Sequence, residues 1–118
     1  MKVGFIGLGN VGGKLSGSLL RNGVELMVHD LNEDFVKAKV AAGAVAGESP
    51  ARMMRECDAV ITCLPSPAAS AAVLKEMLPE VKAGKIWMEM STTDEAEVKR
   101  IGAEVIAAGG AAVDCPVS

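Results

Sequence analysis

The sequence of 118 residues has few aromatic side chains, with two Phe, one Trp and no Tyr. Any hydrophobic core must therefore be aliphatic, and because half of the residues are apolar, a single domain can bury a sizeable one. An excess of basic residues is also missing, since 12 Lys and Arg stand against 15 Asp and Glu. This balance argues against nucleic acid as a partner, because binding it requires a basic face.

Long hydrophobic runs and a full set of paired cysteines are absent as well. No stretch approaches the roughly 20 apolar residues of a membrane span, and the N-terminal apolar run is too short and too broken by Gly for a signal peptide. Cys57, Cys63 and Cys115 are odd in number and lack the spacing of metal ligands, which favours free thiols over a disulfide, redox or metal site. We expect a cytoplasmic protein with no membrane partner and no bound metal.

Short apolar segments alternate with segments of helical periodicity along the whole chain. Strands are predicted over residues 2–7, 24–30, 44–47, 58–65, 85–90 and 111–116, and helices over 10–23, 32–43, 49–57, 66–84 and 92–110. Asn32 and Ser49 are expected as helix caps, and Pro79 as a break. The strands read as nearly continuous apolar runs, typical of parallel strands covered on both faces. This predicts an α/β fold: a Rossmann-type doubly wound parallel sheet of order 3-2-1-4-5-6, forming one dinucleotide-binding domain over residues 1–118.

A G-x-G-x-x-G motif joins the first predicted strand to the first predicted helix. Gly7 permits the tight turn, Gly9 lets a pyrophosphate approach the backbone, and Gly12 lets helix and strand pack closely. The backbone amides around Asn10, Val11 and Gly12 would point at the phosphates. Glycine-rich turns without a ligand also exist, but the position between a strand and a helix favours a dinucleotide site.

An acidic residue stands at the end of the second predicted strand. Asp30 lies 18 residues after Gly12, where a carboxylate that binds ribose hydroxyls is expected. Glu33 and Asp34 follow, although they also suit the first turn of a helix. A negative corner disfavours a 2′-phosphate, so the predicted cofactor is NAD rather than NADP. The single histidine, His29, is expected to be a rim residue beside the adenosine rather than a catalytic group.

These segments resemble the β-hydroxyacid dehydrogenase family, the group of 3-hydroxyisobutyrate dehydrogenase, tartronate semialdehyde reductase and 6-phosphogluconate dehydrogenase. The family's first motif reads G-L-G-x-M-G-x-x-M-A-x-N-L-x-x-x-G, and this chain shares its Gly and Leu positions at 7, 8, 9, 12, 19 and 23. Leu8 therefore joins the predicted cofactor-binding residues. Val11 and Leu15 replace the two Met of the motif, Ser16 replaces Ala, and Ser18 replaces Asn.

Three later segments match the family in the same order. The resemblance implies that Leu64 and Pro65 line the adenosine side of the cofactor and that Thr92 lies near the nicotinamide ribose. It also implies that Ser118, in the opening of the family's D-x-P-V-S-G-G motif, helps to bind the substrate carboxylate. Two plainer readings stay open: Leu64-Pro65 could simply end a strand, and Thr92 with Glu95 could form a helix capping box.

The catalytic Lys of the family lies on a helix well after that last motif and is followed by a largely helical second domain. None of the eight lysines of this chain stands in its place. We therefore expect the NAD-binding domain of an oxidoreductase that transfers hydride between NAD and a small 3-hydroxy acid such as 3-hydroxyisobutyrate, without the helical domain, without a catalytic residue and inactive alone. The alternative is a non-catalytic nucleotide-sensing or interaction module of the same fold.

Two segments rich in small and apolar residues, "AASAAVL" and "AAGGAAVDCPVS", are typical of surfaces made for close packing. An apolar patch left exposed near the sixth predicted strand would promote association. We therefore expect the chain to associate with itself through that edge of the sheet or through the neighbouring helices.

Overall fold

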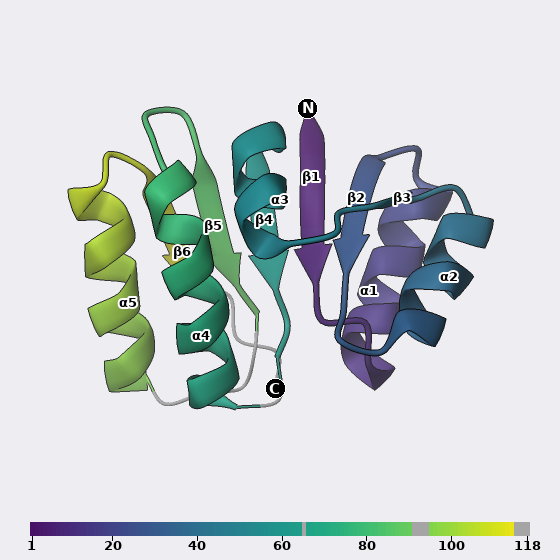
Figure 1. Ribbon diagram of the computed structural model, residues 1–118, viewed down its shortest axis with the longest axis horizontal. Helices are drawn as coiled ribbons and strands as arrows, with labels where there is room; N and C mark the ends of the chain where they lie inside the picture. Colours follow the sequence, from purple (N-terminus) through teal and green to yellow (C-terminus); the bar gives the residue numbers. More distant parts are fainter. Residues whose placement is uncertain (65, 91–94, 115–118) are drawn as a thin grey trace.

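The computed structural model describes residues 1–64, 66–90 and 95–114, and in them six parallel strands form one sheet of order β3-β2-β1-β4-β5-β6. Figure 1 shows the strands side by side with their carboxyl ends toward one edge. The strands are β1 (Lys2–Ile6), β2 (Glu25–His29), β3 (Val45–Ala46), β4 (Ala59–Thr62), β5 (Ile86–Glu89) and β6 (Ala111–Asp114). The helices are α1 (Asn10–Arg21), α2 (Glu33–Ala41), α3 (Pro50–Glu56), α4 (Pro67–Met77), the 3-10 helix η1 (Leu78–Glu80) and α5 (Glu95–Ala107).

This topology confirms the predicted Rossmann-type order. Each predicted strand and helix has its counterpart, and among the described residues some helices end before their predicted bounds, because Gly23, Gly43 and Gly109 lie in turns. The predicted break is also present, since α4 ends at Met77 and the chain continues as η1 through Pro79. The topology reverses between β1 and β4, and the connections on either side of this point lead away from each other.

The helix ends follow the local chemistry of the sequence. The Asn32 side chain accepts a hydrogen bond from the Asp34 amide at 3.0 Å, and Ser49 Oγ accepts one from the Arg52 amide at 3.2 Å, so both predicted caps are confirmed. Gly23 follows α1 with a φ of +78°, in the left-handed region that glycine adopts without strain. Asn32 and Ser49 thereby fix where α2 and α3 begin, and Gly23 fixes where α1 ends before β2.

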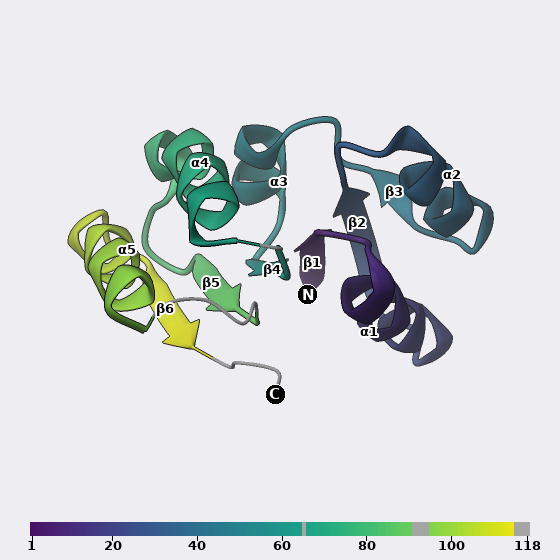
Figure 2. The ribbon, with the colours of Figure 1, turned by 90° about the horizontal axis from the view of Figure 1, so that it is seen from below.

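Side chains of alternating residues build two separate cores on the two faces of the sheet. On β1 and β2, Ile6 and Met27 face one core, whereas Phe5 and Val28 face the other. The first core lies under α3, α4 and α5 and contains Met53, Met54, Cys57, Leu74, Met77, Trp87 and Val105. The second lies under α1 and α2. Figure 2, a view from below, shows α3, α4 and α5 to the left of β1 and α1 and α2 to its right.

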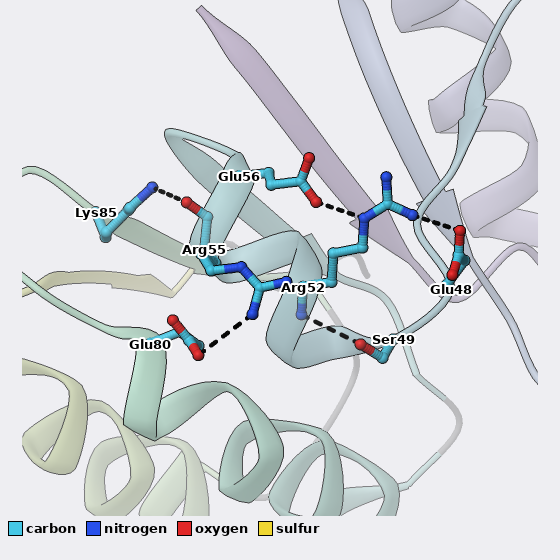
Figure 3. A network of polar contacts seen from close by, with 7 residues as sticks. All are labelled: Glu48, Ser49, Arg52, Arg55, Glu56, Glu80 and Lys85. Carbon is cyan, nitrogen blue, oxygen red and sulfur yellow. Dashed lines mark hydrogen bonds and ion pairs between the residues drawn. The ribbon is translucent and has the colours of Figure 1, made fainter.

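A network of polar contacts holds the short helix α3 in place (Figure 3). The Arg52 guanidinium forms ion pairs with Glu48, at 2.6 Å, and with Glu56. The hydrogen bond from Arg52 holds the pKa of the Glu56 carboxyl below its ordinary value. At the end of the helix, Lys85 Nζ donates to the carbonyl oxygens of Arg55 and Cys57 at 3.0 and 2.6 Å. The start of α3 is thereby fixed beside the carboxyl end of β1.

Two further sequence predictions concern thiols and membranes. Cys57 and Cys63 are free cysteines, as expected, and Cys115 lies outside the described residues. Burial raises the pKa of the Cys57 thiol to about 11. Among the helices of the described ranges, none has both the length and the apolar character that crossing a bilayer demands.

Candidate functional site

A pocket of about 680 Å³ opens at the carboxyl end of β1, at the point where the strand order reverses. Open α/β sheets bind their ligands in the crevice at this reversal, because the two connections diverge there. Figure 1 shows β1 between β2 and β4, with the connection into α1 on one side and α4 on the other. The lining residues predicted from the sequence as cofactor-binding are Gly7, Gly9, Asn10, Val11, Gly12, Asp30 and Leu64.

Two of the three glycines of the motif lie so close to backbone atoms that no side chain fits. Gly7 has a φ of +100°, and a Cβ placed on it would lie 2.2 Å from the Cys63 carbonyl oxygen. A Cβ on Gly12 would lie 1.9 Å from the Gly7 carbonyl oxygen and 3.3 Å from the Phe5 ring. Both positions therefore exclude any side chain, as the tight turn and close helix packing of the motif require.

Gly9 differs, because a Cβ placed there would meet no protein atom within 4 Å. It is the residue before α1, and having no side chain it leaves the first amides of the helix without a side-chain cap. These amides, at Asn10, Val11 and Gly12, belong to residues that line the pocket. A helix start with uncapped amides beside open space fits an anion such as a pyrophosphate.

The carboxylate of Asp30 supports the same loop. Its Oδ2 atom accepts a hydrogen bond from the Leu8 amide at 2.6 Å, and its Oδ1 atom accepts one from the Asn32 amide at 2.8 Å. A carboxylate oxygen has two lone pairs, so each oxygen retains the capacity to accept a ribose hydroxyl. Leu8 itself is 4% exposed and packs in the core under α1, so its amide and not its side chain takes part in the site.

Several lining residues were missed by sequence reasoning. One face of α4 contributes Ala69, Ala72, Val73 and Glu76, and the i, i+3, i+4, i+7 spacing of this face is visible in the sequence once the crevice is known. On the opposite wall, Leu31 is 96% exposed. His29 lines the pocket at the end of β2, in agreement with the rim position expected for it.

Cys63 and Met90 line the pocket where β4 and β5 end. Burial, and next the negative charge of Glu89, raise the pKa of the Cys63 thiol above its ordinary value. The thiol is therefore protonated at neutral pH, and a protonated thiol is a poor nucleophile. Behind it, Trp87 Nε1 donates to Thr62 Oγ1 at 2.9 Å, and Glu89 is fully buried.

A second pocket of about 500 Å³ adjoins the first through His29, Asp30 and Leu31. Its remaining wall comes from α2, β3 and the loop before α3, with Glu33, Val36, Lys37, Ala46 and Glu48. Glu33 and Glu48 add two acids beside Asp30, Lys37 adds one base, and Glu48 is also paired with Arg52. Of the acids that the sequence placed after Asp30, Glu33 lines this pocket.

Three predicted site residues, Pro65, Thr92 and Ser118, lie outside the described residues. The proposed capping contact between Thr92 and Glu95 falls outside them for the same reason.

The comparisons with known proteins agree with this geometry. The family model of the NAD binding domain of 6-phosphogluconate dehydrogenase matches residues 2–118. Mitochondrial 3-hydroxyisobutyrate dehydrogenase of Rattus norvegicus is 36% identical over 119 residues, which cover 98% of this chain and 36% of that protein. The structure of 3-hydroxyisobutyrate dehydrogenase from Salmonella typhimurium aligns with a TM-score of 0.93 and 30% identity, covering 100% of this chain and 42% of that one. The cytokine-like nuclear factor N-PAC of Xenopus tropicalis is 28% identical over 99% of this chain and 22% of its own length.

Fold and site together define a Rossmann-type dinucleotide-binding domain. The chain belongs to the β-hydroxyacid dehydrogenase family, and it corresponds to the N-terminal NAD-binding domain of the 3-hydroxyisobutyrate dehydrogenase type. The resemblance stated from the sequence motifs is thereby confirmed, and so is the class of cofactor. The chain spans about a third of the length of the rat relative, 36%.

Proposed function

We propose that this chain binds NAD in the pocket at the end of β1, with the pyrophosphate on the first amides of α1 and the adenosine ribose on Asp30. The observation that carries this proposal is the open space at Gly9 beside an uncapped helix start. Gly7 and Gly12 shape the loop, and Leu64, which lines the pocket, is assigned to the adenosine side on the family motif. Pro65 and Thr92 are assigned to the same site on the family motif alone.

We further propose that NAD is preferred over NADP. A 2′-phosphate would enter a corner where the carboxylates of Asp30, Glu33 and Glu48 outnumber the ammonium group of Lys37, and the excess of negative charge repels it. Calorimetric titration of the chain with NAD⁺ and NADP⁺ tests this directly. The Asp30→Ala/Leu31→Arg double variant should shift the preference toward NADP⁺, whereas Leu31→Arg alone, which leaves the acid in place, should shift it less. Tighter binding of NADP⁺ by the unmodified chain would contradict the assignment of Asp30, and binding of neither would overturn the proposed function.

The reaction that we propose for the full-length protein is hydride transfer between NAD and a small 3-hydroxy acid, as the name of the rat relative indicates for that protein. The cofactor supplies the hydride chemistry when bound, and the share of this chain is to hold and orient it. Ser118 is assigned to the substrate carboxylate on the family motif. The 118-residue chain alone should not turn over 3-hydroxyisobutyrate, because loss of a proton-transfer group costs roughly a hundred- to ten-thousand-fold. Turnover by the purified chain above the contaminant level would contradict this.

A second function is favoured by one observation, the similarity to the nuclear factor N-PAC, whose name describes no enzyme. In this alternative the domain senses a nucleotide or binds a partner, and catalysis plays no part. Sequencing the coding region beyond Ser118 distinguishes the two: a downstream helical domain with a Lys in the family position supports the enzyme, and its absence supports the module.

A cytoplasmic location stays part of the proposal. The two free thiols among the described residues suit a reducing compartment. The rat relative is named as mitochondrial, so fluorescence microscopy of the tagged full-length protein is the test, and colocalisation with a mitochondrial marker would contradict a cytoplasmic location.

A further inference from the structure

Two carboxylates line the main pocket among its described residues, and the proposed function uses only one of them. Asp30 follows β2 and is bound to the glycine-rich loop. Glu76 stands on α4, which follows β4, and so belongs to the opposite side of β1 (Figure 1). The two acids thus lie on two separate walls of one crevice, and the proposed function gives no role to Glu76.

The wall that carries Glu76 is otherwise built from small apolar side chains. Ala69, Ala72 and Val73 precede it on the same helical face, and none of them has a polar side-chain atom. Leu31, almost fully exposed at 96%, faces the pocket from the connection after β2. An exposed Leu and a strip of Ala and Val on opposite walls suit a flat ring with apolar faces, such as a nucleobase.

The edge of such a ring would then meet the one charged group of this α4 face. A carboxylate accepts hydrogen bonds and donates none. The exocyclic amino group of adenine is a donor, whereas hypoxanthine has a carbonyl oxygen, an acceptor, at the same ring position. Hypoxanthine also carries an N1–H donor beside that oxygen, so the position of the carboxylate matters. A carboxylate that faces the exocyclic position itself, on the side away from N1, attracts the first base and repels the second.

We propose that Glu76 is a specificity residue of the NAD site, which accepts a hydrogen bond from the amino group of the adenine ring. This inference rests on the proposed NAD binding and adds the group that distinguishes one base from another. The side chain of Glu76 is exposed, so water screens its charge and the effect has the size of one hydrogen bond.

Titration of the chain with NAD⁺ and with nicotinamide hypoxanthine dinucleotide tests the proposal. The two ligands differ only at the base edge, so their affinity ratio reports on this contact and on no other part of the site. We expect the unmodified chain to bind NAD⁺ about three- to tenfold more tightly, the range of one net hydrogen bond. Glu76→Gln should bring the ratio close to one, because a carboxamide presents either a donor or an acceptor. Glu76→Ala should do the same by removing the acceptor.

Glu25→Gln is the matched control. It makes the same change of charge on an exposed residue at the amino end of β2, away from the pocket, and should leave the ratio unchanged. Equal affinity of the unmodified chain for both dinucleotides would overturn the inference while leaving NAD binding established. A ratio that persists in both Glu76 variants would also overturn it. If the unmodified chain binds neither ligand, the proposed function itself fails, and this outcome is distinct from the other two.

Discussion

The two faces of the sheet are built from different materials. Under α3, α4 and α5 the core is closed and rich in sulfur, with Met53, Met54, Met77 and Cys57 each at 0% exposure. Under α1 and α2 the core is smaller, α1 carries three glycines, and α2 buries no residue at all. Large flexible side chains fill the core under α3, α4 and α5. On the other face, glycines replace side chains at the loop where a ligand would bind. The glycine-rich loop at the pocket is therefore built with few side chains, and we expect the core under α3, α4 and α5 to contribute more of the stability.

The largest expected effect on stability comes from adding a side chain at a glycine of the loop before and at the start of α1. Gly12→Val should lower the free energy of unfolding by roughly 4 kcal/mol, because even a Cβ would lie 1.9 Å from the Gly7 carbonyl oxygen. Gly9→Ala should change it by less than about 0.5 kcal/mol, since nothing lies within 4 Å, and yet should weaken NAD⁺ binding at least about tenfold. Urea unfolding and calorimetric titration of both variants check the pair. Equal stability of the two variants would contradict the view that Gly12 is required for packing and Gly9 for access of the ligand.

Removing a side chain from the core under α3, α4 and α5 should have the next largest effect on stability. Leu74, 1% exposed, belongs to the core under α3–α5, and Leu74→Ala should cost about 3 kcal/mol by leaving a cavity. Phe35 on α2 is 42% exposed, and Phe35→Ala should cost less than about 1 kcal/mol although it removes more atoms. The midpoint of urea unfolding gives both values. A larger loss for Phe35→Ala would contradict the view that the α3–α5 face carries the stability.

The stability contributed by the core under α3, α4 and α5 should also fall at alkaline pH. The Cys57 thiol has a pKa raised by burial from an ordinary value of 9.0 to about 11. A raised pKa means that the folded state favours the neutral thiol, so this contribution is complete below pH 9 and is lost as the pH rises toward 11. It amounts to about 2 kcal/mol. Unfolding midpoints measured from pH 8 to 11 should fall less steeply in Cys57→Ala, whereas equal slopes would show that the thiol titrates alike in the folded and unfolded states.

The two edges of the sheet give the smallest expected effect. The edge strand β3 has two residues, which leaves little backbone to pair, whereas β6 has four and carries Val113 at 41% exposure. Self-association should therefore occur through β6, and Val113→Lys should weaken it by placing a charge on that edge. Sedimentation velocity over a concentration series compares the unmodified chain with Val113→Lys. A monomer at every concentration, or an association unaffected by Val113→Lys, would contradict this assignment.

Much of the fold was predictable because its signals are local. Asn32 and Ser49 cap helices whatever lies around them, and Gly23 ends α1 because the left-handed conformation there suits Gly. Alternation of apolar runs with helical segments, combined with right-handed crossovers, leaves few possible strand orders. The motif around Gly7, Gly9 and Gly12 was predictable for the same reason, since a strand, a loop and a helix that follow one another in the chain also meet in space.

The rest of the site depends on distant parts of the chain. The burial of Glu89 could not be predicted, because a single Glu in an apolar strand does not reveal how completely the rest of the fold covers it. The bond from the Leu8 amide to Asp30 joins residues 22 positions apart and gives Asp30 a structural role in addition to the predicted one.

The sequence by itself determined the order of the elements, the helix caps and the glycine cradle, because hydrogen bonds between near neighbours and the conformational freedom of Gly act over a few residues. Only the tertiary structure decided which face of α4 lines the crevice, and hence that Glu76 stands opposite the connection after β2. Ala69, Ala72, Val73 and Glu76 share a helix face in any α-helix. Whether that face meets a neighbour, solvent or a pocket depends on the twist of the sheet and on the separation of connections that diverge between β1 and β4.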